Sequence, residues 1–219
     1  MARTGVTESI PQPRIAYLRG SLEESDVADG PVATLRRWLA DAEEEKVHEP
    51  YAMTLATVGK DGAPTTRIVL LREFDESGLV FFTNYESKKG LDLAHEPRVA
   101  ASFFWPELER QVRVIGRASK VPRETTVAYF ATRPRESQLG AWASPQSRGL
   151  IARGELESRL AEFERKFAGQ EVPAPGHWGG YRIVPVGFEF WQGRQSRLHD
   201  RLTFNREADG PWRLTRLAP

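Results

Sequence analysis

Residues 51–71 read Tyr51-Ala-Met-Thr-Leu-Ala-Thr-Val58, Gly59-Lys-Asp-Gly62, Ala-Pro and Thr65-Thr-Arg-Ile-Val-Leu-Leu71, and from Tyr51 the period of the sequence changes from helical to strand-like. Two runs rich in β-branched and apolar residues flank a polar turn bounded by glycines, which predicts two strands joined by a short connection. Similar runs recur along the chain. Further strands are expected at Leu79–Thr83, Val99–Phe104, Val112–Ser119, Tyr181–Trp191, Leu198–Asn205 and Trp212–Thr215.

Helices are expected between these strands. Pro31 opens a segment whose apolar residues repeat at helical spacing, and a short helix over Ser87–His95 stops before Pro97. Three more helices are expected at residues 122–134, around Arg135–Trp142 and at Glu155–Ala168. This combination predicts a mainly β fold with α additions, in which peripheral helices surround a small antiparallel barrel. A Rossmann dinucleotide site is not supported, because the chain has neither βαβ alternation nor a GxGxxG motif.

The first 30 residues differ in composition from the rest of the chain. They contain Pro11, Pro13, Gly20 and Gly30 among many charged side chains. This composition is typical of an arm rather than of a core. We therefore expect a flexible N-terminal arm over residues 1–30 and a single domain over residues 31–219.

Composition narrows the classes of function. The chain has 219 residues, a formal net charge of +1, no cysteine and four histidines. The lack of cysteine excludes disulfides, thiolate zinc sites and cysteine nucleophiles. The histidines form no HExxH-like pair, so we expect no bound metal. The near-neutral charge argues against a nucleic-acid or membrane surface. With no apolar run that resembles a membrane span or a signal peptide, we expect a cytoplasmic protein.

The segment Trp191–Arg201 follows a bulky aromatic run, Phe188-Glu-Phe-Trp191. If its last five residues are extended, Arg197, His199 and Arg201 lie on one face of a strand, because side chains alternate between the two faces. Two permanent cations and an imidazole on one face repel each other unless an anion lies among them. We interpret the row as the wall of an anion site. The alternative is a solvated edge strand whose arginines discourage pairing.

Residues 82–90 lead from a strand into a helix and carry groups that suit a phosphate. A hydroxyl, free backbone N–H groups at the helix start, Lys88 and Lys89 come together there. The alternative is an ordinary N-cap at Ser87 with surface lysines. The strand Arg67–Arg72 is apolar on both faces with an arginine at each end, and its favoured interpretation is a buried central strand with charged ends.

A second candidate phosphate site lies on the helix after Pro122. Tyr129 and Arg133 stand four residues apart on one helix face, and Ser137 follows shortly after. The alternative is a Tyr–Arg stack on the surface. Gln111 and the pair Gln146-Ser147 offer neutral hydrogen-bonding groups without individual specificity. Several segments could thus bind a phosphate, but no motif for a catalytic nucleophile is present. This predicts a protein that binds two phosphorylated small molecules, one of them an organic cofactor that supplies the reactivity.

With these residues identified, the chain resembles the pyridoxine (pyridoxamine) 5′-phosphate oxidase family. The motifs run in family order over about residues 14–219. They are Arg67-Ile-Val-Leu-Leu-Arg72, Phe82-Thr-Asn84, Ser87-Lys-Lys89, Glu109-Arg-Gln-Val112, Tyr129-Phe-x-x-Arg-Pro-Arg135, Ser137-Gln-x-Gly-Ala-Trp142, Gln146-Ser147, Trp178-Gly-Gly180, Phe190-Trp-Gln-Gly193, Arg197-Leu-His-Asp-Arg201 and Arg216-Leu-Ala-Pro219.

The resemblance implies an FMN-binding split β-barrel and a homodimer with FMN at the interface. It implies that FMN is held by Arg67, Ile68, Val69, Leu70, Leu71, Arg72, Phe82, Thr83, Lys88, Lys89, Gln111, Gln146, Ser147, Trp191 and Arg201. It implies that the substrate is held by Arg14, Tyr17, Arg72, Tyr129, Arg133, Ser137, Arg197 and His199. Arg197 and His199, expected from the other subunit, are the implied catalytic pair, and Arg14 and Tyr17 match a segment that folds over the substrate as a lid.

The implied reaction is FMN-dependent oxidation of pyridoxine 5′-phosphate and pyridoxamine 5′-phosphate to pyridoxal 5′-phosphate, with O₂ as acceptor and hydrogen peroxide as product. The chain departs from the family pattern at a few positions. Arg72 replaces a common lysine, Lys88 a common arginine, Phe82 a frequent tyrosine and Glu49 a frequent aspartate. These changes bear on affinity more than on the type of reaction.

Two other functions are compatible with the same residues. One is a related flavin oxidase of another aromatic ring, such as those of phenazine biosynthesis, although a phenazine has no phosphate for the Tyr129, Arg133 and Ser137 site. The other is a non-catalytic carrier of FMN or pyridoxal phosphate. A nucleic-acid-binding barrel is disfavoured, because the chain lacks a basic stripe interleaved with aromatic residues.

Overall fold

The computed structural model describes residues 16–207 and 210–219. Nine strands form one sheet. The strands are β1 (Ala52–Val58), β2 (Pro64–Leu70), β3 (Glu73–Asp75), β4 (Gly78–Asn84), β5 (Arg98–Trp105), β6 (Arg110–Lys120), β7 (Trp178–Gln192), β8 (Asp200–Asn205) and β9 (Arg213–Arg216). The helices are α1 (Pro31–Glu44), α2 (Lys88–His95), α3 (Arg123–Ala131), α4 (Arg135–Ala143) and α5 (Arg153–Lys166), with 3₁₀ turns η1 (Glu24–Val27), η2 (Pro106–Leu108) and η3 (Gln195–Arg197).

The sheet has the order β2-β1-β5-β6-β7-β4-β3, with β8 paired to β7 and β9 to β8. All pairings in the described range are antiparallel. β1 and β2 form the predicted hairpin, in which Ala52 pairs with Leu70 and Val58 with Pro64. The short turns between consecutive strands make this antiparallel arrangement the simplest one for the chain to adopt.

The long strand β7 organises the sheet. Its first six residues pair with β4 and its last six pair with β8, while β6 runs beside most of its length. The β6–β7 register shifts between Ile115 and Gly116. A Cβ on Gly116 would lie 2.3 Å from the carbonyl oxygen of Val184, so the close approach of the two backbones requires glycine there.

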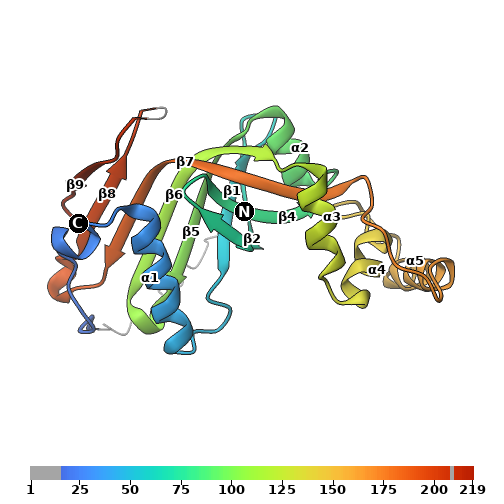
Figure 1. The fold of residues 1–219 in the computed structure, drawn as a ribbon, viewed down its shortest axis with the longest axis horizontal. Helices are drawn as coiled ribbons and strands as arrows, with labels where there is room; N and C mark the ends of the chain where they lie inside the picture. The colour runs from blue at the N-terminus through green and yellow to red at the C-terminus, as the bar shows by residue number, and fades with distance from the viewer. Residues whose placement is uncertain (1–15, 208–209) are drawn as a thin grey trace, which may run out of the picture.

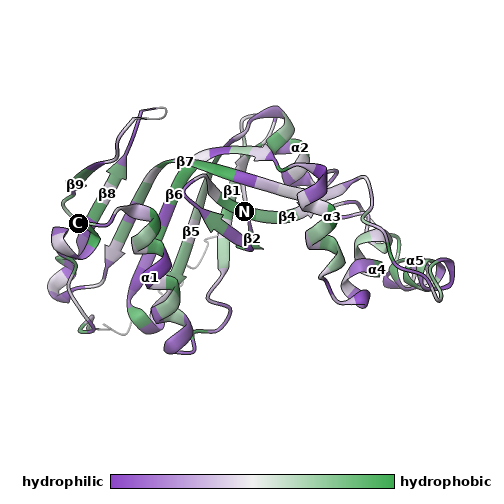
Figure 2. Cartoon of the chain, viewed as in Figure 1, coloured by the Kyte–Doolittle hydropathy of each residue, from purple (hydrophilic) through white to green (hydrophobic). Residues whose placement is uncertain are grey.

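The main core lies between α1 and the sheet (Figure 1). Trp38 and Leu35 of α1 are buried, and the Trp38 ring meets Phe190 of β7 edge-on with centroids 5.2 Å apart. Leu55 of β1 and Val112 of β6 belong to the same core and are fully buried. In Figure 2 the strands are mostly green, whereas the connecting turns and the outer faces of the helices are largely purple.

Helices α3, α4 and α5 form a separate lobe at the other end of the molecule (Figure 1). A second, smaller core holds them together and consists of Phe130, Leu139, Phe167, Val172 and Trp178. Gln138 of α4 donates its Nε2–H to the carbonyl of Phe130 at 2.9 Å, which joins α4 to α3. Trp178, the first residue of β7, attaches this lobe to the sheet.

Several sequence-based expectations need correction. Residues Gln195–Arg197 form a 3₁₀ turn, with positive φ at Ser196 and Arg197, and β8 begins at Asp200. The extended row of residues 197–201 was therefore a wrong prediction. The prediction assumed that these five residues are extended, whereas Arg197 adopts the left-handed backbone of a tight turn.

The strand with arginines at its ends also differs from expectation. It is β2, which pairs only with β1 in the described part of the sheet, and Ile68 is 61% exposed. The favoured interpretation of a buried central strand was wrong, because apolar composition does not distinguish burial within one chain from an exposed apolar face. The short strand β3 was not predicted.

The expected arm over residues 1–30 lies partly outside the described residues. Within the described part, Leu22 and Val27 are buried in the main core. None of the helices in residues 16–207 and 210–219 is long and apolar enough to cross a membrane.

Candidate functional site

A buried lysine marks the point where β4 meets the start of α2. Ser87 caps α2 by accepting the backbone N–H of Gly90, and Lys89 lies in the first turn. Lys89 Nζ donates to Thr83 Oγ1 at 3.0 Å and to Gln146 Oε1 at 2.8 Å. Each of these partners is a neutral oxygen, so the lysine retains an uncompensated positive charge in a partly dehydrated place.

Two further cations adjoin this lysine. Arg67 of β2 donates to Thr57 Oγ1 at 2.6 Å and to Thr65 Oγ1 at 2.7 Å. Asp92 lies 2.6 Å from Lys88 Nζ and 3.8 Å from Arg67 Nη2. Among these side chains and the buried lysine, three cations therefore share one carboxylate, and the cluster has a net positive charge.

Electrostatics within the cluster favour an anion. Burial, and to a smaller extent the positive charge of Arg67, lowers the pKa of Lys89 to about 8. A bound phosphate would supply the negative charge that the cluster lacks and accept several hydrogen bonds at once. The residues present thus fit a phosphate group, and the predicted grouping of Arg67, Thr83, Lys88, Lys89 and Gln146 is close in space.

A second basic cluster lies on the lobe of α3 and α4. Arg133 Nη1 is the one buried side-chain nitrogen or oxygen in the described residues that has no hydrogen-bond partner. Burial lowers the pKa of Arg133, and the positive charge of Arg72 adds to this effect. Ser137 lies in the first turn of α4, where free backbone N–H groups favour anions. A desolvated guanidinium with an unused donor fits a second anion.

Parallel aromatic rings support this second cluster. Phe82 of β4 stacks on Tyr129 with centroids 3.9 Å apart, and Trp178 lies parallel to both. The expected alternative, a surface stack of Tyr129 with Arg133, does not describe the geometry, because the Arg133 guanidinium lies over Trp178 at 4.6 Å. A Cβ on Gly180 would lie 2.9 Å from the Phe82 ring, so the glycine leaves room for the stack.

A third group lies at the far end of β7. Gln111, Trp191 and Arg201 are direct partners across β6, β7 and β8, and side chains opposite each other on neighbouring strands share a face. Arg201 Nε donates to Glu189 Oε1 at 2.9 Å, and its Nη1 donates to the carbonyl of Ala218 at 2.9 Å. Of the expected row of charges, only Arg201 lies on a strand.

His199 precedes β8 and packs against Trp191, with ring centroids 4.7 Å apart. Its Nδ1 accepts the backbone N–H of Arg194 at 3.0 Å, so the neutral imidazole carries its proton on Nε2. Burial lowers the pKa of His199, and the nearby charge of Arg197 lowers it further, which favours the neutral ring. Tyr17 approaches this ring edge-on, with centroids 5.6 Å apart.

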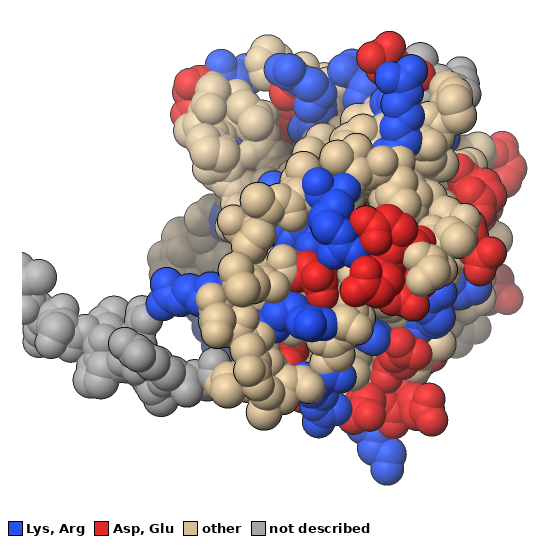
Figure 3. All heavy atoms as spheres, turned by 90° about the vertical axis from the view of Figure 1, so that its left-hand side faces the viewer, with Lys and Arg blue, Asp and Glu red and all other residues tan. Residues whose placement is uncertain are grey.

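The N-terminal segment is attached to this region by an ion-pair network centred on Arg216. Arg216 Nη2 donates to Glu24 Oε2 at 2.8 Å and to Glu23 Oε2 at 3.1 Å, and its Nη1 donates to Asp200 Oδ1 at 2.9 Å. Asp200 also accepts the backbone N–H of Leu22 at 3.1 Å. On this side of the molecule, acidic and basic side chains lie next to each other (Figure 3).

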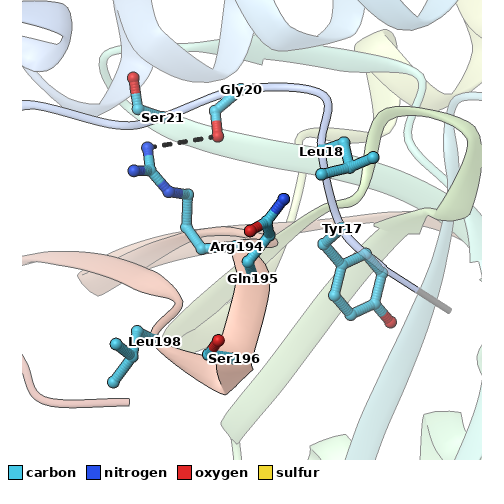
Figure 4. Close-up of a pocket in the computed structure, with 8 residues that line it drawn as sticks. All are labelled: Tyr17, Leu18, Gly20, Ser21, Arg194, Gln195, Ser196 and Leu198. Atoms are coloured by element: carbon cyan, nitrogen blue, oxygen red, sulfur yellow. Dashed lines mark hydrogen bonds between the residues drawn. The ribbon is translucent and has the colours of Figure 1, made fainter. Parts of the chain in front are cut away.

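A cavity of about 550 Å³ lies between residues 17–21 and the connection from β7 to β8 (Figure 4). Arg194 Nη1 spans it by donating to the carbonyl of Gly20 at 3.4 Å. Gly193 leaves room for Tyr17, one of the two residues expected in a lid, because a Cβ there would lie 2.8 Å from the Tyr17 ring. Residue 14, the other expected lid residue (Arg14), lies outside the described residues.

The structure does not bring all the expected site residues together within one chain. Thr83, beside Lys89, pairs with Gly179 at the start of β7, whereas Trp191 is twelve positions further along the same strand. At 3.3 Å per residue this is up to about 40 Å. Figure 1 shows α3 and α4 at one end of the molecule and β8 at the other.

The remaining expected residues surround the first cluster. Ile68, Val69, Leu70 and Leu71 continue from Arg67 along and just past β2. Ser147 follows Gln146 in an exposed turn and has a positive φ of 71°. The sequence reasoning gave Trp178 and Gly180 no role of their own, and the Trp-Gly-Gly motif was the signal that could have indicated one. No group of His, Cys, Asp and Glu in the described range could hold a metal ion.

Two family models match the chain. The one described as pyridoxamine 5′-phosphate oxidase matches residues 39–167, and the one described as the pyridoxine 5′-phosphate oxidase C-terminal dimerisation region matches residues 178–219. A pyridoxine/pyridoxamine 5′-phosphate oxidase of Cupriavidus pinatubonensis is 57% identical over 94% of this chain and 97% of its own length. One of Pseudomonas paraeruginosa is 53% identical over 98% of this chain and all of its own length.

Solved structures agree on the fold. PhzG from Burkholderia lata, in complex with tetrahydrophenazine-1-carboxylic acid, superposes with a TM-score of 0.84 at 30% identity, covering 92% of this chain and all of that one. A pyridoxamine 5′-phosphate oxidase-related, FMN-binding protein of Nostoc punctiforme has a TM-score of 0.68 at 18% identity, over 86% of this chain and all of its own. The predicted mainly β split-barrel architecture with helical additions is confirmed.

The Arg216 network generates a prediction about the N-terminal segment. Arg216→Ala removes the charge-assisted hydrogen bonds that attach Glu23 and Glu24 to Asp200, so we expect the Leu22 amide to exchange its hydrogen about tenfold faster, as measured by hydrogen-exchange mass spectrometry. Arg213→Ala, in the same strand, serves as the control and should leave this amide unchanged. Equal exchange in Arg216→Ala and the unaltered protein would contradict the proposed attachment.

Proposed function

The chain belongs to the pyridoxamine 5′-phosphate oxidase family, and on that premise we propose that it oxidises pyridoxine 5′-phosphate and pyridoxamine 5′-phosphate to pyridoxal 5′-phosphate. The proposal rests on one observation: the chain has two separate clusters that are suited to bind an anion, one around Lys89 and one around Arg133. A phosphorylated cofactor and a phosphorylated substrate require two such clusters.

We assign FMN to the first cluster. Arg67, Lys88 and Lys89 would hold its phosphate, and Thr83 and Gln146 already present their oxygens to Lys89. When bound, FMN supplies the two-electron redox chemistry, with O₂ as the final acceptor and hydrogen peroxide as product. The protein contributes binding, orientation and exclusion of water.

We assign the substrate phosphate to the second cluster. Arg133 offers its unused buried donor, Arg72 adds a second positive charge, and Tyr129 and Ser137 add hydroxyl groups. This chain has Arg72 where the family commonly has a lysine, which keeps the positive charge but changes the geometry of the hydrogen-bond donors. This cluster supports a phosphorylated substrate over an uncharged one.

We propose that the complete site forms between two copies of the chain. Gln111, Trp191 and Arg201 lie too far along β7 from Lys89 to share a ligand of FMN size within one protomer. The match of residues 178–219 to a dimerisation region supports a homodimer. In this arrangement the far end of β7 from one protomer faces the Lys89 cluster of its partner.

The far end of β7 supplies the groups that act on the substrate ring. His199, held neutral with its proton on Nε2, can donate a hydrogen bond from that atom to the substrate. Arg197 stays charged and, in its turn beside His199, is suited to orient and polarise the ring. Tyr17 would close over both, as expected for a lid.

A related flavin oxidase is the second candidate. The likeness to PhzG, solved in complex with tetrahydrophenazine-1-carboxylic acid, favours it. A phosphate carries more negative charge than a single carboxylate, however, so the two cations Arg72 and Arg133 support the phosphorylated pyridine. A non-catalytic carrier would use the same binding residues and is distinguished only by turnover.

An anaerobic titration tests the proposed function. FMN-loaded protein is mixed with pyridoxine 5′-phosphate, and the visible absorbance of the flavin is followed. We expect bleaching that reverses on admission of air, with pyridoxal 5′-phosphate formed. An unchanged spectrum with bound ligand would indicate a carrier, and bleaching only by a phosphate-free aromatic ring would indicate the related oxidase.

The assignment of Arg197 predicts a separation of binding from turnover. Arg197→Met removes a positive charge from an exposed turn that makes no contact with the Lys89 cluster within the protomer, so FMN should remain bound. Turnover should fall at least about a hundredfold, because a charge aimed at the reacting ring is lost. Steady-state kinetics per bound flavin is the measurement, and loss of FMN with unchanged turnover per flavin would contradict the role.

The pKa of Lys89 predicts a pH dependence of FMN affinity. Lys89 is charged below a pKa of about 8 and neutral above it, so the dissociation constant of FMN should rise as pH increases from 8 to 9.5, by up to about tenfold per pH unit. Fluorescence titration of the ligand-free protein measures this. Lys89→Arg stays charged throughout and is the control. Equal pH profiles for the two proteins would contradict the assignment.

A further inference from the structure

Trp178 lies behind the second anion cluster. It is the first residue of β7, pairs with Asn84 of β4, and is 7% exposed. Its ring is parallel to those of Phe82 and Tyr129, with interplanar angles of 13° and 4°. It belongs to the small core that holds the lobe of α3, α4 and α5 on the sheet.

The face of this indole is covered by a cation. The guanidinium carbon of Arg133 lies 4.6 Å from the Trp178 ring centroid and 5.5 Å from that of Phe130. An aromatic face attracts a cation without using its N–H groups, which leaves them directed outward in the guanidinium plane. This matches the Arg133 Nη1 that is buried and has no hydrogen-bond partner among the described residues.

Other contacts do not account for the position of this guanidinium. The salt bridges found in the described residues do not include Arg133, and the nearby charge of Arg72 repels it. A buried cation without a carboxylate is costly unless another group compensates it. The indole face compensates the cation while leaving the donors free, whereas a carboxylate partner would consume them.

We propose that Trp178 is a positioning residue that presents the Arg133 guanidinium to the phosphate of the substrate. The inference rests on the proposed function, because it assigns a substrate phosphate to Arg133. Trp178 itself makes no contact with the ligand. Its effect on affinity is therefore transmitted through Arg133 and is confined to ligands that carry a phosphate.

The test compares Trp178→Leu with Trp178→Phe in the FMN-loaded protein. Dissociation constants are measured by calorimetry for pyridoxal 5′-phosphate and for pyridoxal, which lacks the phosphate. Trp178→Leu should weaken binding of pyridoxal 5′-phosphate about tenfold without changing binding of pyridoxal. Trp178→Phe keeps a smaller aromatic face and should therefore lose less affinity for pyridoxal 5′-phosphate. With pyridoxine 5′-phosphate as substrate, KM should rise while kcat changes little.

Phe167→Leu is the matched control. Phe167 is equally buried, belongs to the same small core and contacts the Trp142 ring with centroids 5.4 Å apart. Its replacement should lower thermal stability in a similar way and leave affinity for pyridoxal 5′-phosphate unchanged. If Phe167→Leu and Trp178→Leu weaken the binding of pyridoxal 5′-phosphate equally, the effect of the Trp178 substitution is a general loss of packing, and the inference is overturned.

A double-mutant cycle separates this inference from the function it rests on. In an Arg133→Ala background, Trp178→Leu should cost no further affinity for pyridoxal 5′-phosphate. If Arg133→Ala weakens binding but neither Trp178 variant does, the positioning role fails and the substrate assignment stands. If Arg133→Ala has no effect on pyridoxal 5′-phosphate, the proposed substrate site itself is wrong. Should the leucine variant fail to fold, the phenylalanine variant carries the same comparison.

Discussion

The length of β7 determines where the two groups of candidate site residues lie in the molecule. One strand of fifteen residues pairs with β4 at its start and with β8 at its end, while β6 runs alongside. Backbone hydrogen bonding therefore fixes the separation between the Lys89 cluster and the Trp191–His199 group, since an extended strand does not shorten. Both groups are held on rigid strands but far apart, and this separation is the reason for the proposed assembly of the site from two copies of the chain.

Both anion clusters follow one electrostatic rule. A cation is held in a partly dehydrated place by neutral contacts, so that its charge is stabilised but not cancelled. Lys89 is held by hydroxyl and amide oxygens, and Arg133 by an indole face. Both pKa values are lowered by burial, which is the cost of keeping these charges ready for a ligand. A carboxylate in direct contact with Lys89 or Arg133 would stabilise the free protein more and weaken the proposed binding of an anion.

The regular elements could be predicted because their local patterns are strong. The β1–β2 hairpin and α1 were expected from β-branched runs, a glycine-bounded turn and Pro31 at the first helical position, and they form nearly where expected. The left-handed turn at Ser196 and Arg197 could not be predicted, because neither residue type favours positive φ. Trp178 was missed for another reason: its partner Arg133 is 45 positions earlier, and sequence spacing says nothing about such a contact.

If a site is divided between two chains, two different inactive variants can restore activity when they form a mixed dimer. In the proposed dimer a protomer that lacks Lys89 still carries an intact His199, and a protomer that lacks His199 still carries an intact Lys89. Either altered chain paired with itself has two defective sites. A mixed dimer has one site with both defects and one site with neither, because the two-fold arrangement combines opposite ends of β7. Two inactive alleles would thus complement each other when expressed together, and the length of one strand would be the reason.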